Sequence, residues 1–511
     1  MKKLLLISGA VSMLTSSFAG QIPAFQQETL EQKAPRAGQG ILDNVKENLS
    51  DNKINNISVY FIGRNGAFIA IQELLSALLT AQNSKKEVYF YLSPGIKDSD
   101  AIGTINWSAI TAHFPNFHFG RSQTQEYITD QDLKAVKDKL QPDQKMDVYI
   151  EDFALGQIRP TQMITDLSAS WSLIDSITFP TDGVGHFGFT AKTQQYLNQL
   201  SDSTKDYYSE IWQSLFTGEK TTADYSSKDL KGASQYLPAI TNFGQGFNKV
   251  NSWVATDQYY LEGTTSPRAW NEIGTGLHQA WTAMTPETQD IFKTAYNLNK
   301  FDFSYTTDKK NIVYSGSLMS EATALANEAA VIVDNYNKFH QNYGQVNILY
   351  KPHPREKQSN LNKLTETVKK TVNDYSDWFH IVPQEVPIEV FPLTDTFITD
   401  LNVETKFAYY MFGTSTSVQT FYEAQATPQI IQFIFPTTQD ITTALNWYGK
   451  NSTVLDFSKA FSQNMPVKHN QWLIILLATL IPTVVIIASG VGGYYLYRHV
   501  KKSKKPVIKS E

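Results

Sequence analysis

The sequence has no cysteine among its 511 residues. This absence excludes disulfides, thiol nucleophiles, and zinc or iron–sulfur sites built on cysteine. A body of this length can be held by core burial alone. There is also no strong excess of either charge, since the net charge is −5, and the one basic cluster stands at the C-terminal end. The composition therefore indicates no nucleic-acid partner.

Residues 1–19 have the pattern of a secretory signal peptide. Two lysines follow the first Met, an apolar run extends from Leu4 to Val11, and small residues lead to Ala19. The run is too short to span a bilayer, which needs about 20 residues. We therefore predict cleavage after Ala19. An uncleaved N-terminal anchor is the alternative.

A second apolar segment, 471–497, predicts a single transmembrane helix. No charged residue occurs from Trp472 to Tyr497, and the length fits a spanning helix. Aromatic residues stand at both ends, and the basic residues of 498–511 predict a cytoplasmic tail. A buried core helix is the alternative. We expect a single-pass protein of the cell membrane whose body is extracellular.

Between these ends, short apolar strands alternate with helical segments in two series. The predicted strands are 57–62, 88–92, 117–119 and 146–150 in the first series, and 312–314, 346–350, 378–382, 406–412 and 429–435 in the second. The intervening segment 191–296 is predicted to be mostly helical and broken at Gly218, Pro238 and Gly263, with a helix start at Thr285. Such alternation predicts an α/β fold of two doubly wound domains, with a ligand at the carboxyl ends of the strands.

Three polar clusters directly follow predicted strands. They are Glu151-Asp152, the loop Lys351-Pro352-His353-Pro354, and the hydroxyl-rich segment 413–417. A carboxylate can accept a proton from a hydroxyl, a histidine can donate one to a leaving group, and hydroxyls that open a helix can bind a phosphate. The alternatives are two solvated acids, a capped turn at the histidine, and ordinary helix capping in 413–417.

The order of these motifs resembles the bacterial sialyltransferases of the Pasteurella multifunctional type. The loop 351–354 is followed by Ile388-Glu389-Val390 and then by the segment 413–417, and related His-Pro motifs occur in lipooligosaccharide sialyltransferases and polysialyltransferases. Segments 284–289 and 312–316 are similar to that family as well. The resemblance extends over 57–439 and is closer from Thr285 onward.

The resemblance implies two Rossmann-like domains of the GT-B type facing a cleft. It implies inverting transfer of sialic acid, or a related acidic sugar, from a CMP donor to a glycan hydroxyl, with no metal and no other cofactor. The implied site consists of Glu151 or Asp152 as base, His353 as acid and phosphate ligand, Glu389 on the donor ribose, Thr414 and Ser415 on the phosphate, and Lys351, Pro354, Gly316 and Ser317 as further donor-binding residues. The acidic pairs Asp98/Asp100 and Asp130/Asp132 resemble a metal motif of other glycosyltransferases, but their polar loops favour ordinary solvated acids.

The expected divisions of the chain follow from these features. They are a signal peptide (1–19), a linker (20–56), an acceptor-side domain (57–234), a nucleotide-sugar domain (235–445), a return segment and stalk (446–470), a transmembrane helix (471–497) and a cytoplasmic tail (498–511).

The sequence departs from the family pattern at the base and on the acceptor side. Phe153 stands where the family's Asp-Asp-Gly motif has glycine, and the segment 315–320 lacks the family's tryptophan. A carboxylate displaced by about 1 Å costs heavily in rate, and an extracellular body is separated from a cytoplasmic donor. Two hypotheses therefore stand: a membrane-anchored glycosyltransferase acting on a glycan acceptor, and a surface adhesin that binds host glycans with the same fold.

Overall fold

The computed structural model describes most of the body of the chain. The described residues are 41–50, 56–64, 66–98, 100–124, 126–156, 159–180, 196–243, 249–254, 270–272, 276–303, 310–316, 322–372, 378–394, 409–412 and 431–434. The expected signal peptide, transmembrane helix and tail, and the site residues Ser317, Thr414 and Ser415, lie outside them. Within the described ranges no helix has both the length and the apolar character needed to cross a membrane.

The first unit is built on a parallel sheet of seven strands. These are β1 (Ile57–Ile62), β2 (Val88–Leu92), β3 (Phe117–Arg121), β4 (Met146–Ile150), β5 (Ile174–Pro180), β6 (Val250–Val254) and β7 (Trp270–Glu272), in the spatial order β3-β2-β1-β4-β5-β6-β7. The predicted strands 57–62, 88–92 and 146–150 are confirmed at both ends. The central strands β1, β2 and β4 are buried along their whole length, as expected for a sheet covered on both faces.

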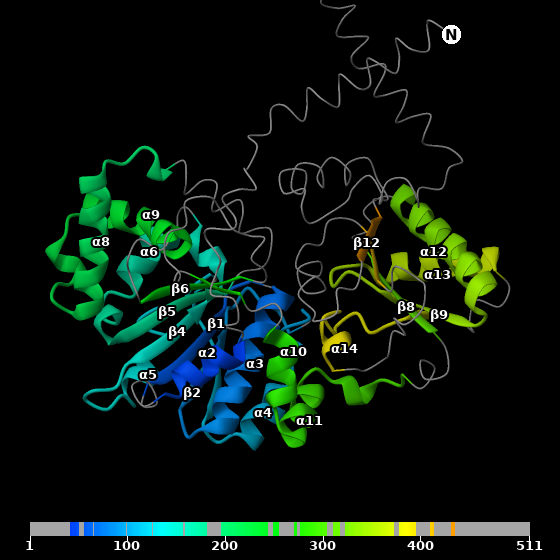
Figure 1. Cartoon of the computed structure of the whole chain (residues 1–511), viewed down its shortest axis with the longest axis horizontal. Coiled ribbons are helices and arrows are strands. Elements are labelled where there is room, and N and C mark those ends of the chain that lie inside the picture. The colour runs from blue at the N-terminus through cyan, green and yellow to red at the C-terminus, as the bar shows by residue number, and fades with distance from the viewer. Residues whose placement is uncertain are drawn as a thin grey trace, which may run out of the picture.

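Helices cover both faces of this sheet (Figure 1). One face carries α2 (Ile41–Asn48), α3 (Ala67–Asn83), α4 (Trp107–His113), α10 (Gly276–Ala283) and α11 (Pro286–Ala295), and the other carries α5 (Lys134–Lys137), α6 (Arg159–Asp166), α8 (Asp202–Thr217) and α9 (Ser227–Phe243). Strand residues alternate between the two cores. Tyr60 and Tyr149 belong to the core under α3, whereas Val59 and Val148 belong to the core on the opposite face.

The expectation that 191–296 is mostly helical is wrong for part of that segment. β6 and β7 pair with the edge of the sheet at β5, so the first sheet continues beyond the expected boundary at 234/235. Pro238 lies inside α9 and does not end it. An interior proline costs a helix about 3 kcal/mol, but α9 buries Ala233, Tyr236 and Leu237 against the sheet, and this packing offsets the loss.

The second unit has a parallel sheet of five described strands. They are β8 (Lys310–Ser315), β9 (Val346–Lys351), β10 (Phe379–Ile381), β11 (Tyr409–Phe412) and β12 (Ile431–Ile434), in the order β10-β9-β8-β11-β12. The long helix α12 (Ala322–Tyr343) and α13 (Gln358–Thr371) pack together over it, and the short helix α14 (Val390–Leu393) follows β10. The predicted strands of the second series are confirmed with ends that differ by a few residues.

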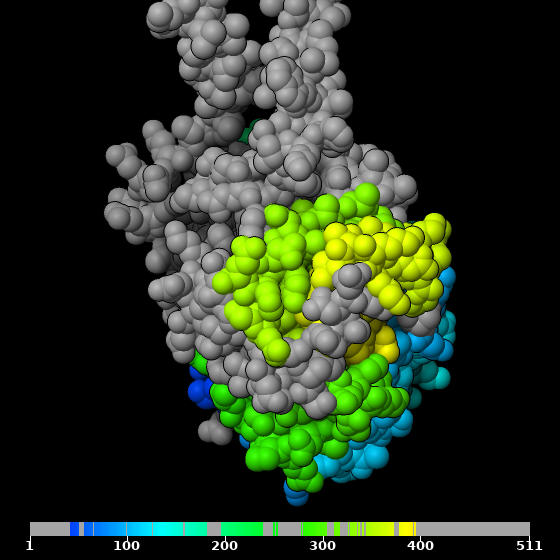
Figure 2. Space-filling model, turned by 90° about the vertical axis from the view of Figure 1, so that its right-hand side faces the viewer, coloured from blue at the N-terminus to red at the C-terminus, as the bar shows by residue number. Residues whose placement is uncertain are grey.

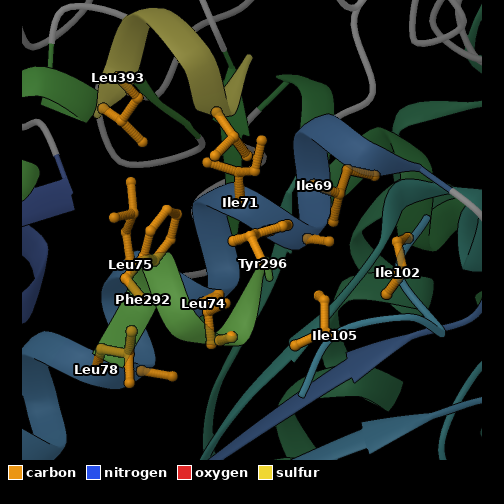
Figure 3. Close-up of a cluster of buried hydrophobic side chains, with 14 of the residues drawn as sticks. Ile69, Ile71, Leu74, Leu75, Leu78, Ile102, Ile105, Phe292, Tyr296 and Leu393 are labelled. Atoms are coloured by element: carbon orange, nitrogen blue, oxygen red, sulfur yellow. The ribbon is translucent and has the colours of Figure 1, made fainter. Parts of the chain in front are cut away.

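The two units share one apolar core. Residues of α3, α10 and α11 form a single buried cluster with Val390, Phe391 and Leu393 of α14. Figure 3 shows Leu393 directed toward Ile71 and Leu75 of α3, with Phe292 and Tyr296 beside them. The space-filling view shows the second unit, in yellow and yellow-green, resting on the green surface of α10 and α11 (Figure 2). The predicted N-cap of α11 is confirmed, because the Thr285 side chain accepts a hydrogen bond from the Thr288 N–H.

Candidate functional site

The strand orders place both candidate clusters at one kind of position. In the first sheet the chain reverses its direction of winding between β1 and β4, and in the second between β8 and β11. Ligands of doubly wound sheets bind outside the carboxyl ends of the strands at such points. Glu151 directly follows β4, and Gly316 directly follows β8, beside the end of β9. The topology therefore supports these residues as parts of a ligand site.

Glu151 and Asp152 are both buried at the end of β4, with 0% and 1% exposure. Asp152 begins a short 3-10 helix, Asp152–Leu155, and Glu151 is the residue before it. The centroid of the neighbouring Phe153 ring lies 4.9 Å from the guanidinium carbon of Arg64. This cation–π contact gives the bulky side chain a defined place at the edge of the sheet.

Lys351 ends β9 and fixes the loop that follows it. Its ammonium is buried and donates hydrogen bonds to the carbonyl oxygens of Pro352, at 2.8 Å, and Gln384, at 3.0 Å. Burial lowers the pKa of Lys351 to about 8, against the opposing attraction of Glu389 and Glu385. The ammonium therefore joins the loop after β9 to the loop after β10.

His353 is oriented by its own loop. Its Nδ1 accepts a hydrogen bond from the backbone N–H of Arg355 at 3.1 Å, so the neutral ring carries its proton on Nε2. Burial, followed by the charges of Arg355 and Lys351, lowers the pKa of His353 to about 4. The ring is therefore neutral near pH 7, with Nε2 as its donor.

Gln384 also stabilises this loop, although the sequence did not indicate it. Its Nε2 lies 2.9, 3.0 and 2.8 Å from the backbone carbonyls of His353, Pro354 and Glu356. One amide group thus contacts three backbone carbonyls of the His-Pro loop. The signal in the sequence was weak, because a glutamine in a loop after a short strand has many ordinary roles.

Glu389 lies at the start of α14 and is 2% exposed. Burial raises its pKa to about 7, although the charge of Lys351 acts in the opposite direction. For both partners, burial outweighs their mutual attraction. His353 and Glu389 each interact electrostatically with Lys351, so the structure brings these three predicted site residues into one cluster.

Gly316 is packed so closely that no other residue fits without displacement. Its N–H donates to the Lys351 carbonyl at 2.8 Å, and a Cβ added at this position would lie 2.1 Å from the hydroxyl oxygen of Tyr350. That hydroxyl is itself held by the carboxylate of Glu328 at 2.5 Å. Gly316 therefore allows β8 and β9 to end side by side.

The acidic pair Asp130/Asp132, with its metal-like spacing, has local partners. Asp132 accepts hydrogen bonds from Ser122, the backbone of Gln123, and Thr129, and Asp130 pairs with Lys137. In the parts of the chain that the structure describes, no three histidine or acidic side chains are grouped as a metal site would require. These carboxylates thus organise the loop between β3 and β4.

One known family matches part of this chain. Residues 254–398 match the model of the alpha-2,8-polysialyltransferases (POLYST). The match includes the loop 351–354 and Glu389 and ends before Thr414. It supports a sialyltransferase family assignment, without singling out the Pasteurella multifunctional type. None of the curated proteins matches the chain.

Several solved structures are similar to this chain at low identity. The UDP-GlcNAc 2-epimerase from Methanocaldococcus jannaschii has a TM-score of 0.35 and 11% identity, covering 81% of this chain and 94% of that one. A glycosyltransferase from Rickettsia africae has a TM-score of 0.30 and 8% identity, covering 80% and 89%. An alpha,alpha-trehalose-phosphate synthase from Burkholderia vietnamiensis has a TM-score of 0.25 and 9% identity, covering 83% and 100%.

Proposed function

We propose that this protein is a sialyltransferase-like glycosyltransferase. It moves sialic acid, or a related acidic sugar, from a CMP donor to a hydroxyl of a glycan acceptor, with inversion and without a metal or another cofactor. The observation that carries the proposal is the His353 loop, which lies within the polysialyltransferase match and aligns a histidine donor at the end of β9.

In this mechanism Glu151 removes the proton from the acceptor hydroxyl. The freed oxygen bonds to the anomeric carbon while the bond from that carbon to the phosphate oxygen breaks. The leaving phosphate oxygen receives a proton from His353 Nε2. Glu151 is preferred to Asp152 because it directly continues β4, whereas Asp152 starts the 3-10 turn. Since Glu151 is fully buried, an acceptor reaches it only after the packing above it opens.

Binding of the donor would also allow His353 to become protonated, as a general acid must be. The pKa of about 4 keeps the ring neutral in the free protein, and a neutral imidazole is a poor acid. A phosphate placed beside the ring stabilises the imidazolium, so its pKa rises toward the working pH. We therefore expect CMP to bind with proton uptake, and its affinity to fall as the pH rises through the bound-state pKa.

The decisive test combines nucleotide binding with turnover of a CMP-activated sugar. His353→Ala should slow transfer or donor hydrolysis by roughly 10²-fold or more, the usual contribution of a positioned acid, and should weaken CMP binding in calorimetry. Glu151→Gln should abolish transfer and keep the wild-type affinity for CMP. Asp152→Asn is the matched control. A wild-type protein that neither binds CMP nor consumes an activated sugar would overturn the proposal. Cell attachment that survives all three changes would then favour the adhesin.

We also propose that the chain is anchored in the cell membrane by segment 471–497. The support is the uncharged run in the sequence, the basic tail after it, and the signal-like N-terminus. Protease added to intact cells should digest the body and leave the tail protected. Protection of the body would place it inside the cell, next to the supply of donor.

A further inference from the structure

Glu73 is a buried carboxyl group that the proposed mechanism does not yet use. It lies on α3 with 0% exposure, among neighbours that belong almost entirely to the apolar core. Within the described part of the molecule, neither carboxyl oxygen of Glu73 has a hydrogen-bond partner from the rest of the protein. A buried acid without partners destabilises a fold, so its presence here calls for a functional reason.

The register of the sheet places Glu73 against Glu151. Tyr60 of β1 stands opposite Tyr149 of β4, and the Tyr60 hydroxyl bonds the Ser76 hydroxyl of α3 at 2.9 Å. Glu151 is two residues beyond Tyr149 and so follows it on the same face. Glu73 is one turn before Ser76, and because α3 runs back along the sheet, that turn also lies toward the carboxyl ends of the strands.

The charge of Glu151 also acts on Glu73, as their placement on one face of the sheet leads us to expect. Burial, and then the charge of Glu151, raise the pKa of Glu73 well above its usual value. The charge of Glu73 in turn is one of the causes that raise the pKa of Tyr60 of β1, after burial. On the neighbouring helix α2, Lys46 and Asp43 are exposed and pair with each other. Glu73 therefore keeps its proton to a higher pH than an exposed glutamate does.

We propose that Glu73 is a positioning residue for the base: its protonated carboxyl, which makes no hydrogen bond in this structure, turns to donate one to the carboxylate of Glu151 when an acceptor enters the site. This inference rests on the proposed function. The hydrogen bond stabilises the ionised form of Glu151 and restricts its rotation. When Glu151 takes the acceptor proton, the pair passes from one shared proton to two, and Glu73 itself neither gains nor loses one.

The first test measures the thermal stability of the full chain between pH 4 and 8, without any activity assay. The raised pKa of Glu73 means that the folded state keeps a proton which the unfolded state releases, so wild-type stability declines as the pH rises above the usual value of about 4.5. Glu73→Gln removes this term. We expect the Tm of the variant, relative to that of the wild type, to be higher near pH 8 than near pH 4. A Tm difference that does not change with pH would overturn the proposal.

The second test measures the pH–rate profile of donor hydrolysis. Glu73→Leu removes the hydrogen-bond donor, so the acidic limb of the profile should move up by about 1 pH unit, as expected for the loss of one hydrogen bond to a charge. Glu73→Gln keeps an N–H donor and should leave the limb near its wild-type position. Ser76→Ala, on the same face of α3, is the control for disturbed packing and should lower Tm without moving the limb.

The two tests separate this inference from the function on which it rests. An active wild type whose acidic limb is unmoved in Glu73→Leu would refute the role of Glu73 and leave the transferase intact. An inactive wild type would refute the transferase, while the pH dependence of the Tm difference would still decide whether Glu73 holds a proton in the folded protein.

Discussion

The acid sensitivity of the fold should depend on His353. Its pKa falls from 6.5 to about 4 on folding, mainly because the ring is buried. Between these two pKa values, the histidine binds a proton in the unfolded chain but not in the folded protein. Stability is therefore fully present above pH 6.5 and is lost as the pH falls toward 4. A shift of 2.5 units (6.5 minus 4) corresponds to about 3.4 kcal/mol, an upper limit because the ring is partly exposed to solvent.

The assay is urea unfolding of the full chain at intervals from pH 7.5 to 4. His353→Gln cannot take up the proton, so its free energy of unfolding should fall by about 2–3 kcal/mol less over this range than that of the wild type. His340, an exposed histidine of α12, supplies the control variant His340→Gln, which should retain the wild-type loss. Equal acid losses in wild type and His353→Gln would refute the reasoning that burial keeps the ring neutral.

Two further changes test the packing around the two sheets, and a third tests nucleotide binding. Lys86→Met leaves the buried Asp147 carboxylate without its ion-pair partner, so denaturation should show a loss of about 3–5 kcal/mol; a loss below ~1 kcal/mol would contradict the burial of this pair. Gly316→Ala places a Cβ against the fixed hydroxyl of Tyr350 and should cost about 1–3 kcal/mol, measured by the same method; unchanged stability would mean that the ring can move. Lys351→Met removes the link between two loops, so calorimetry should show weaker CMP binding, and wild-type affinity would rule out this role of the ammonium.

Apart from β5, β6 and β7, the strands were predictable because their apolar runs are short and distinct from the helical segments around them. Runs such as 57–62 and 146–150 contain mostly β-branched and aromatic residues and are buried on both faces. β5, β6 and β7 were missed; in β6, Asn251 and Ser252 interrupt the apolar pattern. Pro238 predicts a helix end, since the sequence does not show the packing that keeps α9 continuous.

The candidate site was predictable only where a residue stands beside a strand end. His353 and Glu151 were found in this way. Gln384 and Glu73 were missed, because their relevance depends on contacts between segments that are distant in the sequence. The carbonyls that Gln384 binds lie about thirty residues before it, and Glu73 looks like an ordinary polar position of a helix until the sheet is placed beneath it.

The apolar core shared by the two units has a consequence for dissecting the protein. The segment that matches the polysialyltransferase family, 254–398, contains α10, α11 and α14 but not α3, whose residues belong to the same buried cluster. Excised alone, it would present Leu277, Trp281, Phe292 and Leu393 to water. Such a fragment should aggregate when expressed, and the boundary of the sequence family is therefore not a boundary of independent folding.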